Sequence, residues 1–370
     1  MIIFNEISKE EFLTYYWQKK PLLLKQALPN FISPINPNEL AELSLEDEIE
    51  SRIVKGSIDG HEWALNYGPF IEKTYSTLPK KNWTLLVQGV DRFVDEVYQM
   101  IEHFDFVPRW RFDDVMASYA VTGGSVGPHF DYYDVFLLQG EGRRRWHLST
   151  KNCCDNNYLD NVPLKIMRTF EPEYVFEVGP GDILYIPPKV AHHGVSLDDK
   201  CTTFSFGYRS YTNQELLEST EKHNSIISTI QYYEDPTLEL NECPALITQS
   251  AINKAKKLVH ISTNQFACCV TKIDSFDLNI LQNFQFQIQN EGFDYYAKYF
   301  LHASCKVAYT INNESVKMYI NGEYIDVNDS KPEAITNFCN SRKIDCKNDD
   351  IFSVNIAKKL FRLGLLDKAI

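Results

Sequence analysis

The sequence predicts an α+β protein built from a double-stranded β-helix (a jelly roll), then a helical region and a small winged-helix-like domain. Three observations lead to this fold class. Short alternating segments separated by Gly, Pro and Asn/Asp turns fill residues 50–210. Helical periodicity replaces strand alternation after about residue 211. Helical segments then flank a short β-ribbon near the end of the 370-residue chain, so we expect two or three domains.

The first elements are helical and precede the strands. Residues 10–26 begin with EEFLTYYWQKK, an amphipathic pattern that Pro21 interrupts before an apolar strand, LLLK. Residues 38–50 carry leucines at near-helical spacing. The strands expected after them are SRIVKG, WTLLVQGV, VMASYAVTGG, YDVFLLQG, RRRWHLST, YVFEVGPGDILYIPP and TTFSFGYRS.

The second half of the chain predicts helices and one ribbon. Residues 213–230 and 244–260 have no strand alternation and are expected to be helical. After a mixed segment from about residue 263 come a strand-like VKMYINGEYIDV, a helix KPEAITNFCN and a final helix VNIAKKLFRLGLL. This order is typical of a winged-helix-like domain. The expected division is a jelly-roll domain at 1–210, a helical region at 211–262 and the winged-helix-like domain at 263–370.

The net charge of −13 is unevenly distributed. The segment from residue 263 onward carries 12 Lys+Arg against 13 Asp+Glu, which leaves 25 against 37 for the part before it. An acidic front portion repels nucleic acid and attracts basic partners, although solubility alone explains acidity equally well. The near-neutral last part lacks the basic face of a DNA-reading domain, so no direct DNA binding is expected.

The cysteines and the N-terminus indicate a reducing cytoplasmic setting. Nine cysteines, an odd number, occur without a CxxC pair. The N-terminal MIIFNEISKEEF has neither a basic region nor a long apolar run, and no stretch reaches the roughly 20 apolar residues of a membrane span. We therefore expect a soluble protein with no membrane association.

A metal site is predicted where GPHFDYYDVF meets AHHG. If Pro128 starts a strand, then His129, Asp131 and Tyr133 share one face because side chains alternate along a strand. A third ligand is expected after the strand DILYIPP, from His192 or His193, and the spacing does not choose between them. Two imidazoles and one carboxylate form the facial triad of non-haem Fe(II) oxygenases, whereas thiolates would indicate zinc and carboxylates alone magnesium.

The HxD pair alone is weak evidence, because such tripeptides are common in surface loops. It gains weight beside the later histidine and a cationic strand. The other histidines lack ligand spacing and are expected in the core or on the surface; they are at positions 61, 103, 147, 223, 260 and 302.

The cationic strand is GEGRRRWHLST. Alternation places Arg144 on the face of Trp146 and Leu148, which should point inward. A guanidinium inside a barrel needs an anionic partner, and a dicarboxylate cosubstrate provides one. A buried ion pair with a protein carboxylate, or an exposed arginine edge, is the alternative. Thr203 and Ser205, on one face of TTFSFGYRS, could offer hydroxyls to the same ligand or serve ordinary packing.

These motifs resemble the JmjC-type bacterial ribosomal oxygenases, which share a cupin-like jelly roll. The resemblance covers about residues 10–210 strongly and the rest by domain order. It rests on VGPHFDYYDVFLLQGEGRRRW, PGDILYIPP, AHHG and FSFGYR, with YYWQKKPLLLKQA, ELAELSLEDEIESRIV, WTLLVQGVDRF and RWRFDDVMASYA in support. The family hydroxylates an arginine of a large-subunit ribosomal protein, the sixteenth in the usual series. The HH pair here replaces a His followed by an acidic residue, and the C-terminal parts differ most.

The resemblance implies a role for each candidate residue. It implies Fe(II) at His129, Asp131 and His192, and O2 as a further cosubstrate. It implies 2-oxoglutarate held by Arg144 with help from Ser118 and from either Thr203 or Ser205. It implies Asp114 and Tyr133 near the iron as the groups that hold the target arginine, although Asp114 could also be a plain edge residue. The family also implies a homodimer through the helical region.

Three other readings remain open. A JmjC demethylase, or a hydroxylase acting on another protein, differs only in the steps after C–H attack. A cupin-like scaffold protein with a vestigial metal site fits poorly with an intact triad and Arg144. A cupin-type sugar isomerase fits the arginine strand poorly as well.

Overall fold

A computed structural model describes residues 2–56, 63–160, 162–219, 227, 229–313, 315–327 and 330–369. The chain forms two compact units. The first unit comprises residues 1–104, 112–210 and 236–240, and the second comprises residues 105–111, 211–235 and 241–370.

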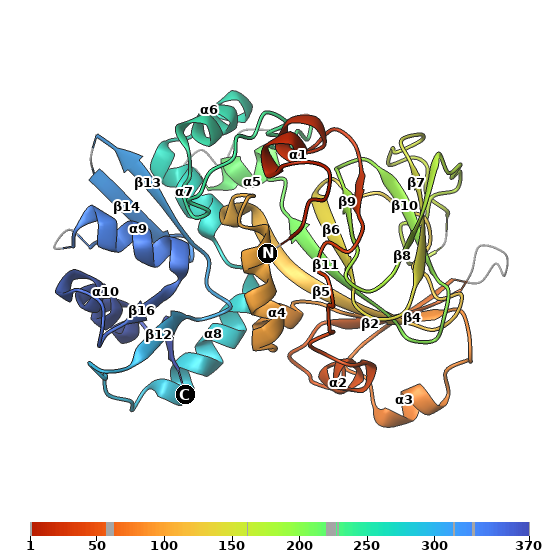
Figure 1. The fold of residues 1–370 in the computed structure, drawn as a ribbon, viewed down its shortest axis with the longest axis horizontal. Coiled ribbons are helices and arrows are strands. Elements are labelled where there is room, and N and C mark those ends of the chain that lie inside the picture. Colours follow the sequence, from red (N-terminus) through yellow and green to blue (C-terminus); the bar gives the residue numbers. More distant parts are fainter. Residues whose placement is uncertain are drawn as a thin grey trace. The chain divides into compact units, whose positions relative to one another are not determined.

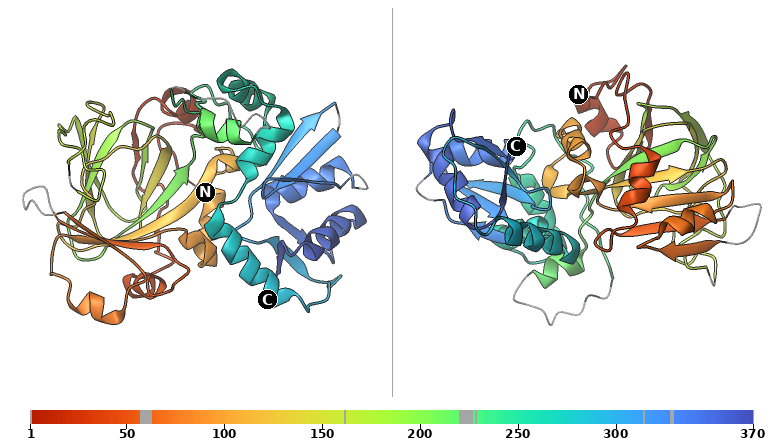
Figure 2. Two further views of the ribbon diagram at one scale, coloured as in Figure 1. Left: turned by 180° about the vertical axis from the view of Figure 1, so that it is seen from behind. Right: turned by 90° about the horizontal axis from the view of Figure 1, so that it is seen from below.

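Two antiparallel sheets face each other as the walls of the first unit (Figures 1 and 2). The large sheet has the order β1-β9-β6-β11-β5-β4-β2-β3, and the small sheet the order β10-β7-β8. This arrangement confirms the α+β class and the predicted jelly roll. The strands are β1 (Leu22–Leu24), β2 (Ser51–Lys55), β3 (Ala64–Tyr67), β4 (Trp83–Val87), β5 (Phe112–Ala120), β6 (Asp134–Gln139), β7 (Arg144–Ser149), β8 (Tyr174–Val178), β9 (Ile183–Ile186), β10 (Ala191–Ser196) and β11 (Cys201–Tyr208).

The two faces of the large sheet have opposite character because side chains alternate along each strand. On β11, Phe204 and Phe206 are fully buried on the outer face, where the ring of Phe206 lies 4.4 Å from that of Phe104. Phe12 of helix α1 (Lys9–Tyr15) covers the same outer face. The inner face carries small and polar groups instead, with Thr203 paired in register to Ser118 and to Gln139. The interior of the barrel is therefore prepared for polar ligands.

The early helices start at side-chain caps. Ser8 accepts a hydrogen bond from the backbone of Glu11, whose carboxylate accepts one from Ser8, and Asn36 and Glu39 do the same for α2 (Pro37–Leu43). Both helices are shorter than the spacing predicts. Helices α3 (Glu72–Ser76) and α4 (Asp95–Met100) and the single turns Val90–Arg92, Ile101–Phe104 and Arg109–Arg111 lie in segments for which we expected no helix.

One local prediction about the metal site is wrong. We expected a strand from Pro128 through the HxD pair, but β6 begins only at Asp134. His129 instead forms an isolated antiparallel bridge to His192. Because Met167 also donates its backbone N–H to the carbonyl of Pro128 (2.7 Å), this segment bonds to two neighbours in place of one regular ladder. His192 lies on β10, a strand that the sequence did not reveal.

The second unit combines helices with two small antiparallel sheets, ordered β16-β12-β17 and β13-β14-β15. In one apolar cluster of this unit, Tyr233 stacks on Phe266, and Trp110 meets both rings edge-on. The elements are α5 (Asn213–Glu218), α6 (Gln249–Leu258), α7 (Thr263–Thr271), α8 (Ser275–Ile288), β12 (Lys298–Leu301), β13 (Val307–Asn312), β14 (Ser315–Ile320), β15 (Glu323–Ile325), α9 (Pro332–Ser341), β16 (Lys343–Asp345), α10 (Ile351–Arg362) and β17 (Leu366–Lys368).

The C-terminal predictions fare unevenly. The ribbon 316–327 is confirmed as β14 and β15, joined at Asn321 and Gly322, whose φ angles of 52° and 87° suit a tight hairpin. The helix expected over 213–230 ends at Glu218 as α5, and residues 220–226 and 228 lie outside the described residues. The boundary between 211–262 and 263–370 stays a prediction. No helix in the described part of the chain is long and apolar enough to cross a membrane.

Candidate metal centre

Three side chains converge inside the barrel. Ligand atoms of His129, Asp131 and His192 all lie within 4.8 Å of one another. The rings of the two histidines are 4.2 Å apart, and Nε2 of His192 lies 3.7 Å from Oδ2 of Asp131. The expected meeting of these residues is confirmed, although the first two reach it from the segment before β6.

Backbone contacts fix both imidazoles. The N–H of each histidine donates to the carbonyl of the other, at 3.1 and 2.7 Å. Nδ1 of His129 lies 3.0 Å from the carbonyl of Gly127, and Nδ1 of His192 lies 3.2 Å from that of Val190. These contacts orient Nδ1–H toward the carbonyls and leave both Nε2 atoms for a metal. Burial, followed by the neighbouring His129, lowers the pKa of His192 to about 4, so the imidazole is neutral at neutral pH.

The choice between His192 and His193 follows from the register of β10. His192 and Gly194 point inward opposite Leu148 and Trp146 of β7. His193 points to the other face, where its ring lies 5.8 Å from that of His147. Trp146 presses against Gly194 so closely that a Cβ there would lie 2.6 Å from the indole. Burial, followed by His147, lowers the pKa of His193 to about 4.

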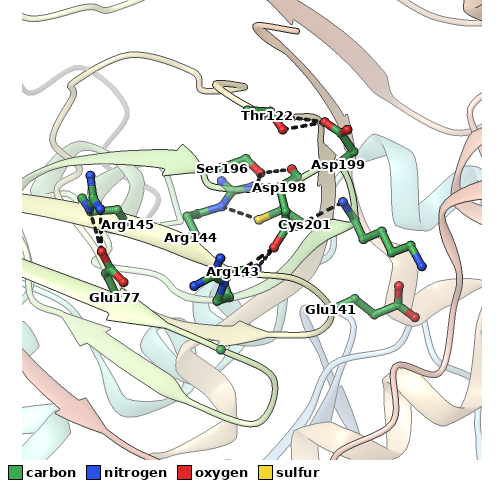
Figure 3. A network of polar contacts seen from close by, with 12 residues as sticks. Thr122, Glu141, Arg143, Arg144, Arg145, Glu177, Ser196, Asp198, Asp199 and Cys201 are labelled. Carbon is green, nitrogen blue, oxygen red and sulfur yellow. Dashed lines mark hydrogen bonds and ion pairs between the residues drawn. The ribbon is translucent and has the colours of Figure 1, made fainter. Parts of the chain in front are cut away.

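Arg144 is buried inside the barrel with an open edge. Its side chain is only 4% exposed, as the alternation of β7 predicts. Nε donates to Sγ of Cys201 (3.3 Å), and Nη2 has no hydrogen-bond partner among the described residues. In Figure 3, Arg144 points toward Cys201, whereas Arg145 and Arg143 point toward the carboxylates of Glu177 and Asp198. Arg145 pairs with Glu177 at 2.6 Å, and Arg143 lies 4.0 Å from Asp198.

Hydroxyls lie on the inner face of the large sheet. Ser118 and Thr203 are buried, and Ser205 is half-buried. The hydroxyl of Thr203 donates to Oε1 of Gln139 (3.1 Å), and that of Ser118 lies 3.4 Å from the carbonyl of Thr203. Their roles as ligand-binding residues stay predictions. In this structure the hydroxyl of Thr203 is engaged with Gln139.

Asp114 of β5 and Tyr133, which directly precedes β6, are the two residues predicted to bind the substrate. The amide of Gln88 (2.6 Å) and the backbone N–H of Gly89 (2.9 Å) both donate to Oδ2 of Asp114. Oδ1 has no hydrogen-bond partner in the described part of the chain. Burial, opposed by the charge of Arg92, raises the pKa of Asp114 to about 7. The carboxylate of Asp131, followed by burial of the phenol, raises the pKa of Tyr133, although the residue as a whole is 42% exposed.

Sequence reasoning missed three polar residues around these groups. Gln139 and Cys201 lie behind Arg144, and Gln88 holds Asp114. Strand alternation could have placed the first two on the inner face, because Gln139 pairs with Thr203. No sequence signal identifies Gln88. Of the other histidines, His61 and His223 lie outside the described residues. Among the described residues, none of the remaining histidines belongs to a group that could bind a metal.

The donor set fits Fe(II). Two neutral imidazoles and one carboxylate on one side of a metal leave its other positions for further ligands. The unpartnered Nη2 of Arg144 fits a ligand carboxylate, because an isolated buried guanidinium is costly. A ligand that binds the metal at one end and carries a carboxylate at the other matches both requirements.

Comparisons with known proteins agree with this chemistry. Residues 99–216 match the family model for the JmjC domain. A probable ribosomal oxygenase of Haemophilus influenzae is 39% identical over 66% of this chain and 59% of its own length, and a ribosomal protein uL16 3-hydroxylase of Escherichia coli is 37% identical over 69% and 67%. The chain thus spans less than two thirds of the first relative.

Solved structures extend the similarity to the whole chain. The Escherichia coli ribosomal oxygenase YcfD, in complex with cobalt and 2-oxoglutarate, superposes with a TM-score of 0.70 at 28% identity. The match covers 99% of each chain. A second structure of YcfD from Escherichia coli gives a TM-score of 0.69 at 27% identity, over 100% of both chains.

Proposed function

This chain belongs to the JmjC-domain ribosomal oxygenases, and on that premise we propose that it hydroxylates an arginine side chain of a large-subunit ribosomal protein, using Fe(II) and 2-oxoglutarate. One observation carries the proposal. A metal triad and a buried guanidinium with an open edge lie on the inner face of one barrel.

The protein's part in the reaction is to position the reactants. His129, Asp131 and His192 would hold Fe(II), and Arg144 would hold the far carboxylate of 2-oxoglutarate, with Ser118 and either Ser205 or Thr203 in support. When bound, Fe(II) with 2-oxoglutarate and O2 supplies the oxidation that converts a C–H bond to C–OH, with succinate and CO2 as coproducts. The backbone bridge and the Nδ1 contacts keep the histidine ligands in place before the metal arrives.

Asp114 supports an arginine as the target. Two donors occupy Oδ2, so Oδ1 remains for a guanidinium. Gly207 leaves room beside it, because even a Cβ there would lie 3.9 Å from Oδ1. Tyr133 supplies an aromatic wall near Asp131 for the same side chain. The acidic first 262 residues would attract a basic ribosomal protein.

Assembly and the last domain are part of the same proposal. The family resemblance implies a homodimer through residues 211–262 and a winged-helix-like domain at 263–370. Light scattering on the purified chain tests the dimer, and a monomer at all concentrations would remove it from the proposal.

Mass spectrometry of uL16 tests the function. The ribosomal protein, incubated with the enzyme, Fe(II), 2-oxoglutarate and O2, should gain the mass of one oxygen atom on one arginine. The gain should vanish with Asp131→Ala. Conversion of 2-oxoglutarate to succinate with no change to uL16 would retain the chemistry and reject the substrate. Loss of a methyl group from a methylated peptide would favour the demethylase reading, and no turnover with any basic protein would favour the scaffold.

A further inference from the structure

Arg144 is held from behind by a neutral partner rather than by a carboxylate. The only side-chain hydrogen bond of its guanidinium within the described residues runs from Nε to Sγ of Cys201, at 3.3 Å. No acidic group lies within ion-pair distance of it in the same part of the chain. Both flanking arginines have such a partner in Glu177 or Asp198. The positive charge of Arg144 is therefore uncompensated before a ligand binds.

Cys201 is itself fixed in place. It is fully buried at the start of β11, and its sulfur also accepts a hydrogen bond from Nε2 of Gln139 at 3.3 Å. Gln139 is fully buried too, donates to the carbonyl of Glu141 (2.7 Å) and accepts from Thr203. All polar atoms of the Gln139 amide are thus engaged. Two rigid donors converge on one sulfur, and the direction of Nε fixes the plane of the guanidinium.

The open edge of Arg144 is an independent sign of a ligand at this place. Nη2 is buried and has no hydrogen-bond partner among residues with a described position, and Arg144 itself is more than nine-tenths buried. An unsatisfied buried donor needs an explanation, and for a charged guanidinium a bound carboxylate provides one. The sulfur of Cys201 accepts the hydrogen bond from Nε. The Nη atoms therefore remain to donate hydrogen bonds to a ligand carboxylate.

We propose that Cys201 is a positioning residue that holds Arg144 by a neutral hydrogen-bond acceptor, so that the full charge of the guanidinium remains available to the distal carboxylate of the cosubstrate. An aspartate in this place would satisfy Nε equally well but would form a buried ion pair with Arg144. That pair would compete with the incoming carboxylate for the same cation. The inference rests on the proposed use of 2-oxoglutarate, because it concerns the same pocket.

A matched pair of substitutions tests the role of charge. Cys201→Asn and Cys201→Asp have the same size and differ only in charge. Calorimetric titration of the full chain with 2-oxoglutarate, under anaerobic conditions with Mn²⁺ in place of iron, should show a Kd about 10-fold weaker for Asn. For Asp the Kd should weaken by about 100-fold or more. Equal affinities for the two variants would overturn the proposal.

A second pair keeps the test decisive if the Asp variant does not fold. Cys201→Ser retains an acceptor and should bind 2-oxoglutarate within about 3-fold of the natural protein, whereas Cys201→Ala should bind about 10-fold more weakly. The KM for 2-oxoglutarate should follow these affinities while kcat changes little. If Ala binds as well as Ser, then Cys201 has no positioning role.

Two controls separate this inference from the proposed function. Cys339→Ala removes a thiol of equal burial from the second unit and should leave the affinity unchanged. The natural protein is titrated first: if it does not bind 2-oxoglutarate, the proposed function fails. If it binds and the Cys201 variants behave alike, only the role of Cys201 fails.

Discussion

The two faces of the small sheet β10-β7-β8 carry the same residue types in opposite circumstances. On the outer face, Arg145 pairs with Glu177 and His193 stacks on His147. On the inner face, Arg144 has no carboxylate partner in the part of the chain that the structure describes, and His192 offers a ligand atom that lies within 4.8 Å of those of His129 and Asp131. Arg145 and Glu177 thus neutralise each other on the outer face, whereas Arg144 on the inner face has no acidic partner among the described residues.

This difference identifies function more surely than residue type does. Neighbouring arginines and neighbouring histidines look alike in a sequence, and only the alternation of the strands separates them. A buried charge without a partner costs folding free energy, so its persistence indicates a ligand. Matched substitutions of inner and outer residues can test this difference by its effects on metal affinity, 2-oxoglutarate affinity and stability.

The largest contrast should be between His192 and His193. Replacing His192 by Ala removes one of three metal ligands, so the affinity for Fe(II) should fall by more than about 100-fold and turnover should vanish. His193→Phe should keep the metal affinity within about 3-fold, because that ring faces away from the centre. Titration with Co²⁺, followed by its visible absorbance, compares the two. Equal losses would mean that His193 takes part in metal binding.

Arg144 and Arg145 should differ next. Arg144→Met should weaken 2-oxoglutarate binding by about 100-fold or more. It should also raise the free energy of unfolding of the ligand-free protein by about 1–3 kcal/mol, because an unpaired buried charge disappears. Calorimetry and urea unfolding measure both effects. A destabilised Arg144→Met would show that a group of the chain compensates the charge of the guanidinium.

The inner face of the large sheet should respond to pH through Asp114. Its pKa is raised from 3.8 to about 7, so the carboxyl is protonated below pH 7 in the free protein. Pairing with a substrate guanidinium needs the ionised form, so kcat/KM should rise with pH up to about 7. Asp114→Asn should abolish most of this rise and most of the activity. The pH profile of kcat/KM, measured with the ribosomal protein as substrate, checks this prediction. If Asp114→Asn leaves the profile unchanged, Asp114 does not bind the substrate guanidinium.

Stability gives a second readout for the same group. A carboxyl whose folded-state pKa is raised favours the folded state when protonated, so its ionisation lowers the free energy of unfolding as pH rises from about 4 to about 7. Asp114→Asn should remove a decline of about 4 kcal/mol over this window. Urea unfolding at several pH values would contradict the assignment if both proteins showed the same decline.

The smallest effect is expected for the outer arginine. Arg145 and Glu177 are each about half exposed, so Arg145→Ala should change the free energy of unfolding by less than about 0.5 kcal/mol. The affinity for 2-oxoglutarate should be unchanged. A large loss of affinity would mean that the two faces are not independent.

Much of the first unit could be predicted from sequence because strands such as β7 alternate between inward and outward side chains. The inward direction of Arg144 and the hydroxyl face of β11 followed from that period alone. The segment from Pro128 to Tyr133 could not be predicted, because its backbone bonds to β10 and to Met167, which are distant in sequence. Polar residues such as Gln88 act through tertiary contacts that leave no local pattern.

Gly194 has a consequence for how the barrel can assemble. His192 and His193 are adjacent, and both carry an imidazole that can bind a metal. A slip of β10 by one residue would bring His193 to the inner face, where its imidazole would be chemically equivalent to that of His192. The slip would also put Val195 against Trp146, where there is no space even for a methyl group. Because Gly194 has no side chain under the indole of Trp146, only the observed register of β10 fits. This steric constraint keeps His193 out of the metal site before any metal binds.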